Sequence, residues 1–90
     1  MTLTFLARRW SEEDLAKRIC QLLYGGDQVR KEDQHGSRRW HIGNANDAWL
    51  HPKEGEVFVL HYRYGTPKRM AALATMLEWR LGVELLPDVP

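Results

Sequence analysis

The spacing of apolar residues along the chain changes from a helical period to alternation and back again. In the first stretch, apolar side chains recur every three to four residues, at Leu15, Ile19, Leu22 and Leu23. Ser11 lies three residues before Asp14, whose backbone amide its hydroxyl can cap, and Gly25 can end the helix in the left-handed conformation. The pattern predicts a helix over residues 11–24.

A second helical stretch lies near the end of the chain. Thr66 is a suitable N-cap, and Pro67 follows at the first helical position, where a missing amide costs no hydrogen bond. Gly82 supplies the stop. The apolar stripe comprises Met70, Leu73, Leu77 and Leu81, widened by Met76 and Trp79. We therefore expect a helix over residues 67–81.

Between these helices the period falls to two, and β-branched and aromatic residues become frequent. Turn-forming residues at 44–47 and 52–55 interrupt the pattern. The pattern predicts strands over residues 38–43, 48–51 and 56–64. Because their connections are too short for crossovers, the strands should form an antiparallel meander.

Three further segments have weaker patterns. Residues 2–7 alternate loosely and allow a short extra strand at the N-terminus. Residues 27–37 are polar and charged without a period, which predicts a mobile charged loop or a poor edge strand. Residues 83–90 combine apolar side chains with prolines, and we expect this tail to pack briefly and then fray.

A chain of 90 residues has room for a single domain, here residues 1–90. We expect a small α+β domain in the order α-β-β-β-α, and the pattern of residues 2–7 allows an extra strand in front. A meander sheet with both helices packed on one face is the economical way to hide these amphipathic elements.

The alternation assigns each strand residue to one of two sheet faces. The more apolar set should face the helices, because burial of apolar area dominates. That set comprises Trp40, Ile42, Ala48, Leu50, Phe58, Leu60, Tyr62 and Tyr64. The opposite face then carries Val57 and Val59 and the candidate protein-binding residues Arg39, His41, Trp49, His51, His61 and Arg63.

This opposite face has two interpretations. It is a binding surface, since Trp and Arg are frequent among interface hot spots. Alternatively, it is covered by the N-terminal strand, by the 27–37 segment or by a second copy in a homodimer.

The charge balance and the cysteine content exclude several classes of protein. Thirteen Lys and Arg against twelve Asp and Glu give a net charge of +1. This excludes an acidic nucleic-acid mimic and a protein held to phosphate by bulk charge. The single Cys20 excludes an internal disulfide and fits a reducing, cytoplasmic compartment. No apolar run is long enough to cross a bilayer and no secretory signal is evident, so we expect no membrane association.

Candidate chemistry is sparse. His41, His51 and His61 share one predicted face, but no cysteine pair or helical His-x-x-x-His supports a metal site. Cys20 and Asp47 are best explained by packing and by capping, and there is no glycine-rich phosphate loop. We predict neither a metal nor a cofactor, and we predict that the protein is not an enzyme.

The segment Pro67-Lys68-Arg69 places two basic residues at a helix N-terminus, which suits a phosphate. Together with the order α-β-β-β-α, it resembles the double-stranded-RNA-binding domain, whose final helix begins with phosphate-contacting basic residues. The resemblance implies nucleic-acid contacts at Lys68 and Arg69, to which Arg39 on the sheet could add. Ala72 stands in place of the family's third basic residue, and the 44–47 turn lacks its Gly-Pro-x-His pattern.

The sequence thus favours a protein-binding module that docks on a larger protein or complex through the outer sheet face. An adaptor, an assembly factor or an inhibitor of the phage or mobile-element kind would fit this description. The alternative is a nucleic-acid-binding domain that uses Lys68 and Arg69.

Overall fold

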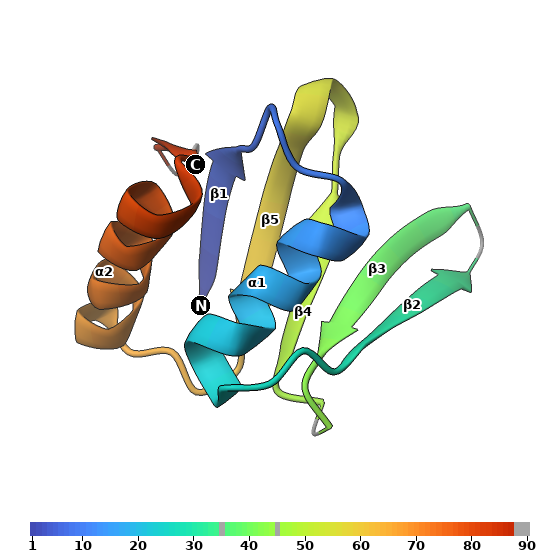
Figure 1. Ribbon diagram of the computed structural model, residues 1–90, viewed down its shortest axis with the longest axis horizontal. Coiled ribbons are helices and arrows are strands. Elements are labelled where there is room, and N and C mark those ends of the chain that lie inside the picture. The colour runs from blue at the N-terminus through green and yellow to red at the C-terminus, as the bar shows by residue number, and fades with distance from the viewer. Residues whose placement is uncertain (35, 45, 88–90) are drawn as a thin grey trace.

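The computed structural model describes residues 1–34, 36–44 and 46–87, and within them the chain forms one antiparallel sheet with two helices (Figure 1). The strands are β1 (Thr2–Leu6), β2 (Val29–Gln34), β3 (Ser37–Ile42), β4 (Ala48–Pro52), β5 (Val57–Tyr62) and β6 (Glu84–Leu86). The helices are α1 (Glu12–Tyr24) and α2 (Pro67–Met76). The radius of gyration, 12.0 Å, matches the value of about 12 Å expected for one folded domain of this length. The predicted small α+β domain is confirmed.

Both helices begin and end where the sequence predicts. The Ser11 hydroxyl accepts from the Asp14 amide at 3.1 Å, and Gly25 ends α1 at φ 79°. The Thr66 hydroxyl accepts from the Arg69 amide at 3.2 Å, with Pro67 in the first turn of α2. These caps satisfy backbone groups that a helix end leaves free.

The last turn of the second helix is π-helical, over Leu77–Leu81, and it corrects one prediction. Leu77 and Leu81 are buried, but Trp79 is 86% exposed. Trp79 lies two residues from each leucine and therefore points to the opposite side of the helix. Its assignment to the apolar stripe is wrong.

The sheet has the strand order β2-β3-β4-β5-β1-β6. The β3-β4-β5 part is the predicted meander. The N-terminal strand exists as β1 and inserts between β5 and the tail strand β6. The tail therefore adds a short edge strand, while residues 88–90 lie outside the described part of the chain.

The segment 27–37, expected as a mobile loop or a poor edge strand, contains the regular edge strand β2. It pairs with β3 over its whole length, from Val29 opposite Ile42 to Gln34 opposite Ser37. Val29 is the apolar residue of β2 and packs against the core, while the rest of the strand is polar and mostly exposed where it reaches beyond α1 (Figure 1). Without a buried face the strand shows no period-two signal, and of the two interpretations the edge strand is correct.

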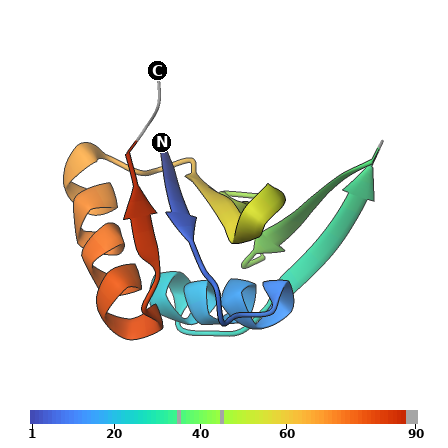
Figure 2. The ribbon, with the colours of Figure 1, turned by 90° about the horizontal axis from the view of Figure 1, so that it is seen from above.

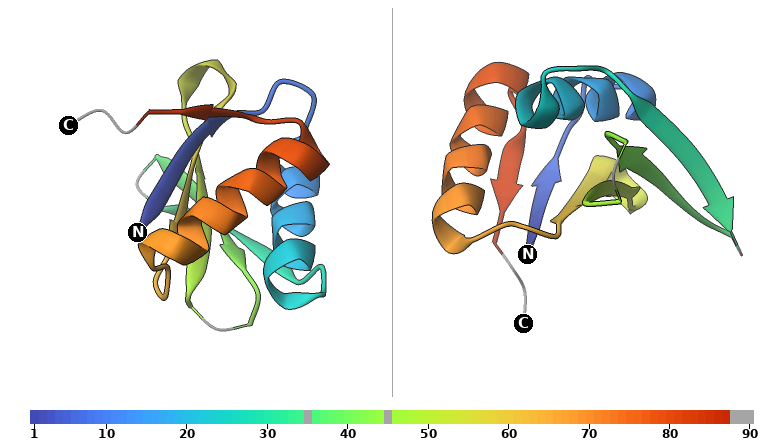
Figure 3. Two further views of the ribbon diagram at one scale, coloured as in Figure 1. Left: turned by 90° about the vertical axis from the view of Figure 1, so that its left-hand side faces the viewer. Right: turned by 90° about the horizontal axis from the view of Figure 1, so that it is seen from below.

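Both helices cover the same face of the sheet. Their side chains join one core whose fully buried members include Phe5, Leu15, Ile19, Ile42, Leu50, Leu60 and Leu77. α1 packs under β3 and β2, and α2 lies against β1 near the other edge. Figures 2 and 3 show both helices on one side, so the opposite sheet face has no helical cover.

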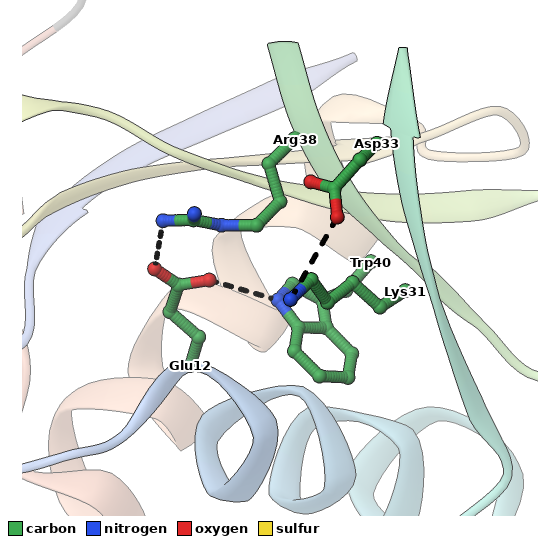
Figure 4. Close-up of polar contacts among 5 residues, drawn as sticks. All are labelled: Glu12, Lys31, Asp33, Arg38 and Trp40. Atoms are coloured by element: carbon green, nitrogen blue, oxygen red, sulfur yellow. Dashed lines mark hydrogen bonds and ion pairs between the residues drawn. The ribbon is translucent and has the colours of Figure 1, made fainter. Parts of the chain in front are cut away.

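One carboxylate joins α1 to β3 on the helical side (Figure 4). Glu12 Oε1 accepts from the Trp40 indole nitrogen at 3.1 Å, and Glu12 Oε2 accepts from Arg38 at 2.5 Å. The first turn of α1 thereby contacts β3 between the middle of the β2–β3 hairpin and its turn.

Candidate docking surface

The alternation of the strands assigns faces as the sequence predicts, with two exceptions, Arg63 and Tyr64, which follow the end of β5. Trp40, Leu50 and Leu60 form one cross-strand row toward the helices and are buried. Tyr64 lies beyond the end of β5 and is 54% exposed, so its placement in the core is wrong. A strand that ends at Tyr62 cannot hold Tyr64 against the core.

The outward-facing side chains of β2 to β5 form what we call the outer face: Arg30, Glu32, Gln34, Ser37, Arg39, His41, Trp49, His51, Val57, Val59 and His61. β1 and β2 lie in the plane of the sheet as its own strands. Within the described part of the chain, neither of them covers this face. The interpretation that the N-terminal strand or the 27–37 segment hides it is therefore wrong.

Aromatic and cationic side chains on the outer face pack against one another. The Trp49 and His61 rings stack with centroids 5.1 Å apart and planes inclined by 12°. His51 meets His61 edge-on at 5.2 Å. The Arg39 guanidinium lies 5.9 Å from the centre of the Trp49 ring, within the range of a cation–π contact. Four of the predicted binding residues thus form one continuous cluster.

Two contacts of Glu32 extend this cluster to β2. Glu32 is a residue that the sequence did not indicate as part of the site. Glu32 Oε2 lies 2.5 Å from His41 Nε2, and Glu32 Oε1 lies 3.4 Å from the Arg39 guanidinium. The hydrogen bond with His41 lowers the pKa of the Glu32 carboxyl, and the charge of Arg39 lowers it further. Glu32 could have been found only by recognising β2 as a strand, because its register sets Glu32 opposite Arg39.

His41 is 7% exposed although it belongs to the open side of the sheet. Its neighbours across the strands are Arg30 and Trp49, which shield the ring. Its Nδ1 atom is buried and has no hydrogen-bond partner among the described residues. His41 therefore contributes to the outer face by contacting Glu32. It exposes little of its own surface to a partner.

His51 and His61 on the outer face have cations as their charged neighbours. Burial lowers the pKa of His51, and the charges of Lys53 and Arg39 lower it further. Burial likewise lowers the pKa of His61, followed by His51, the N-terminal amine, Lys53 and Arg39. No carboxylate contributes to either pKa shift.

A shallow hollow of about 280 Å³ opens beside this cluster. It is lined by Glu32, Gln34, Ser37, Arg39 and His51. The hollow lies between the hairpin of β2 and β3 and the adjoining strand β4, so polar groups from three strands border it.

The structure separates the remaining predicted residues from this cluster. Arg63 follows β5, is exposed, and places its guanidinium 5.8 Å from the centre of the Tyr64 ring. Lys68 and Arg69 are exposed in the first turn of α2, where Arg69 donates to the Tyr64 carbonyl at 3.3 Å. α2 packs against β1, three strands from β3, or roughly 14 Å at the usual strand spacing. Because α2 lies on the helix-covered side of the sheet and Arg39 projects from the outer face, Lys68 and Arg69 lie across the sheet from Arg39.

The topology also differs from the strand order that the resemblance to the double-stranded-RNA-binding domain implies. Four strands, not three, lie between α1 and α2, and β1 and β6 extend the sheet beyond β5. What remains of the resemblance is the central meander between two helices and the two basic residues.

Other candidate chemistry has structural explanations. Cys20 is buried and its thiol donates to the Gln28 carbonyl at 3.3 Å. Across residues 1–34, 36–44 and 46–87, His, Cys, Asp and Glu side chains nowhere gather in a group of three that could hold a metal ion. Within the same ranges, neither helix is long and apolar enough to cross a membrane.

Comparisons with protein-family models, with curated proteins and with solved structures found no match for this chain.

Proposed function

We propose that this protein is a non-enzymatic, cytoplasmic docking module that binds a larger protein through its outer face. The observation that carries the proposal is the stack of Trp49 on His61, with Arg39 and His51 packed around it. An adaptor, an assembly factor or an inhibitor of the phage or mobile-element kind would act in this way.

Three physical arguments support this reading. Trp and Arg are the residues most often found at interface hot spots, and here they are adjacent and only partly buried. These side chains already contact one another, so binding a partner would cost less of their rotamer entropy. The charged edge strand β2 also disfavours pairing at the sheet edge, which leaves the face as the better binding surface.

The test compares two tryptophan variants in affinity capture from nuclease-treated extract of the source cells. Trp49→Ala removes the centre of the outer face, and Trp79→Ala removes an exposed tryptophan at the end of the second helix. We expect a specific protein that wild type and Trp79→Ala retain and Trp49→Ala loses. With that protein purified, Trp49→Ala should weaken binding by about 2 kcal/mol or more, roughly 30-fold in Kd.

Other outcomes would refute the proposal. Equal capture by both variants would place the binding site elsewhere. A wild-type dimer that Trp49→Ala converts to a monomer would show that a second copy covers the outer face.

The second candidate function is nucleic-acid binding through Lys68 and Arg69, and their exposure at a helix N-terminus favours it. The measurement is fluorescence anisotropy with duplex RNA, duplex DNA and single-stranded RNA at about 50 and about 200 mM salt. Binding that falls steeply with salt, and that the double variant Lys68→Glu/Arg69→Glu abolishes, would establish it. No binding at low salt would exclude it.

A further inference from the structure

We infer that the hollow beside Trp49 receives a carboxylate of the protein partner, so that the docking segment combines an acidic side chain with an apolar one. The inference rests on the proposed function and specifies the chemistry that the outer face would recognise. Its basis is the geometry of Arg39, the size of the hollow and the charge of its surroundings.

The hollow has the size of a side-chain site. Its volume of about 280 Å³ is below the range of about 300–1,000 Å³ that small-molecule sites occupy. Its border supplies hydrogen-bond donors, namely the guanidinium of Arg39, the amide of Gln34 and the hydroxyl of Ser37. A single acceptor-rich group on a partner side chain fits this description.

Arg39 is the group best placed to bind that acceptor. Its guanidinium has five N–H donors in a planar fork, and its side chain is 38% exposed. Among the described residues its hydrogen bond is the one to Glu32 at 3.4 Å, while Trp49 supports it at 5.9 Å. Most of the fork is thus available for the bidentate pairing that arginine makes with carboxylates.

Glu32 also borders the hollow, but both of its carboxylate oxygens already have partners within the protein. One of its oxygens contacts His41 at 2.5 Å and the other contacts Arg39. After burial, the charges of Arg39 and Lys53 lower the pKa values of His51 and His61, and the N-terminal amine also lowers that of His61. An anionic group therefore approaches a surface of complementary sign.

The spacing of the two anchors suits an extended segment. The Arg39 guanidinium and the Trp49 ring centre are 5.9 Å apart. Side chains two residues apart on an extended chain point the same way and lie about 6.6 Å apart. An acidic residue on Arg39 would thus place the side chain two positions away on the Trp49–His61 stack.

The test uses two acetylated and amidated pentapeptides, Ser-Glu-Ser-Phe-Ser and Ser-Gln-Ser-Phe-Ser, titrated into the ¹⁵N-labelled protein. At about 10 mM, where a ligand with a Kd near 1 mM is almost saturating, the Glu peptide should shift the Arg39 Nε–H and the Trp49 indole N–H. We expect the Gln peptide to bind at least tenfold more weakly. Arg39→Gln should abolish the difference between the peptides, and Arg39→Lys should keep a smaller one because it retains the charge without the fork.

Three results would overturn the inference. Equal affinity for the two peptides would exclude the carboxylate. Tighter binding of inorganic phosphate or oligothymidylate than of the Glu peptide at Arg39 would assign the hollow to phosphate. The absence of any shift on the outer face would exclude a linear acidic segment. The comparison of Trp49→Ala with Trp79→Ala against the captured protein is independent of these peptides, so the proposed function can stand or fail separately.

Discussion

The imidazole of His61 lies against the indole of Trp49, with 5.1 Å between ring centres and 12° between ring planes. The two residues are direct partners in the β4–β5 register, so strand pairing alone brings the rings together. Such a stack on a sheet face without helical cover gives the protein a rigid, partly exposed surface. The predictions below test the placement, support and charge of that surface.

Trp49→Ala should leave the fold intact, in contrast to Trp40→Ala on the other face of the sheet. Trp49 loses a partly exposed aromatic pair, worth about 0.5–1.5 kcal/mol. Trp40 is 8% exposed and belongs to the core, where truncation of a tryptophan costs about 3–5 kcal/mol. Urea denaturation of the two variants measures the difference, and equal losses of stability would contradict the assignment of faces.

Glu12 should matter more to stability than its neighbour Glu13. Glu12→Ala leaves the part-buried Trp40 indole N–H without its acceptor, at a cost of about 1–3 kcal/mol. Glu13→Ala removes only a 3.9 Å surface pair with Lys17, worth about 0.5 kcal/mol or less. Because both variants remove a carboxylate from the first turn of α1, the helix-dipole contribution largely cancels. A Glu13 variant as unstable as the Glu12 variant would show that the link to Trp40 contributes nothing.

Stability should fall as the pH drops below about 6.5 because His51 and His61 have lowered pKa values in the folded state. The unfolded chain then binds protons that the folded protein does not, so this contribution is complete above pH 6.5 and declines down to the folded pKa values. NMR titration of His61 should give a midpoint below 6.5, and His61→Gln should reduce the loss of stability. A midpoint above 6.5 would mean that neither burial nor the neighbouring cations govern the pKa of His61.

A further loss of stability in more acidic solution should depend on Glu32. The hydrogen bond with His41 lowers the pKa of Glu32 from its ordinary value of 4.5. The associated stability is present above pH 4.5 and is lost as the pH falls through the lower, folded value. Glu32→Gln should flatten the stability profile in this acidic range, as measured by urea denaturation at several pH values. An unchanged profile would show that the contact with His41 is not maintained in solution.

Much of the fold follows from local sequence signals. Ser11, Gly25, Thr66 and Pro67 mark the helix ends, and alternation assigns the faces of β3, β4 and β5. The strand β2 gives no such signal, because it protrudes beyond α1 and its pairing with β3 replaces burial as the source of order. Propensity and periodicity report on burial, and an edge strand with two polar faces lacks it.

The candidate site was predictable only in part. The alternation of side chains along the strands is enough to place four of the residues on one face, namely Arg39, Trp49, His51 and His61. The burial of His41 and the role of Glu32 depend on the neighbouring strand and could not be inferred without it. Arg63 was misplaced in the predicted cluster because β5 ends one residue before it, so alternation no longer applies there.

The four tryptophans offer the most direct test of the claim that the outer face is the docking surface. The Trp10 indole N–H donates to the Leu81 carbonyl, and the Trp40 indole N–H donates to Glu12. Trp79 is exposed at the end of the second helix, and Trp49 lies in the outer face. The indole N–H resonances of the ¹⁵N-labelled protein would be recorded as the captured partner is added to saturation. The docking account predicts a large shift or broadening at Trp49, with Trp10, Trp40 and Trp79 essentially unchanged beyond general broadening. A shift at Trp79 with Trp49 unchanged would contradict it and move the interface to the second helix.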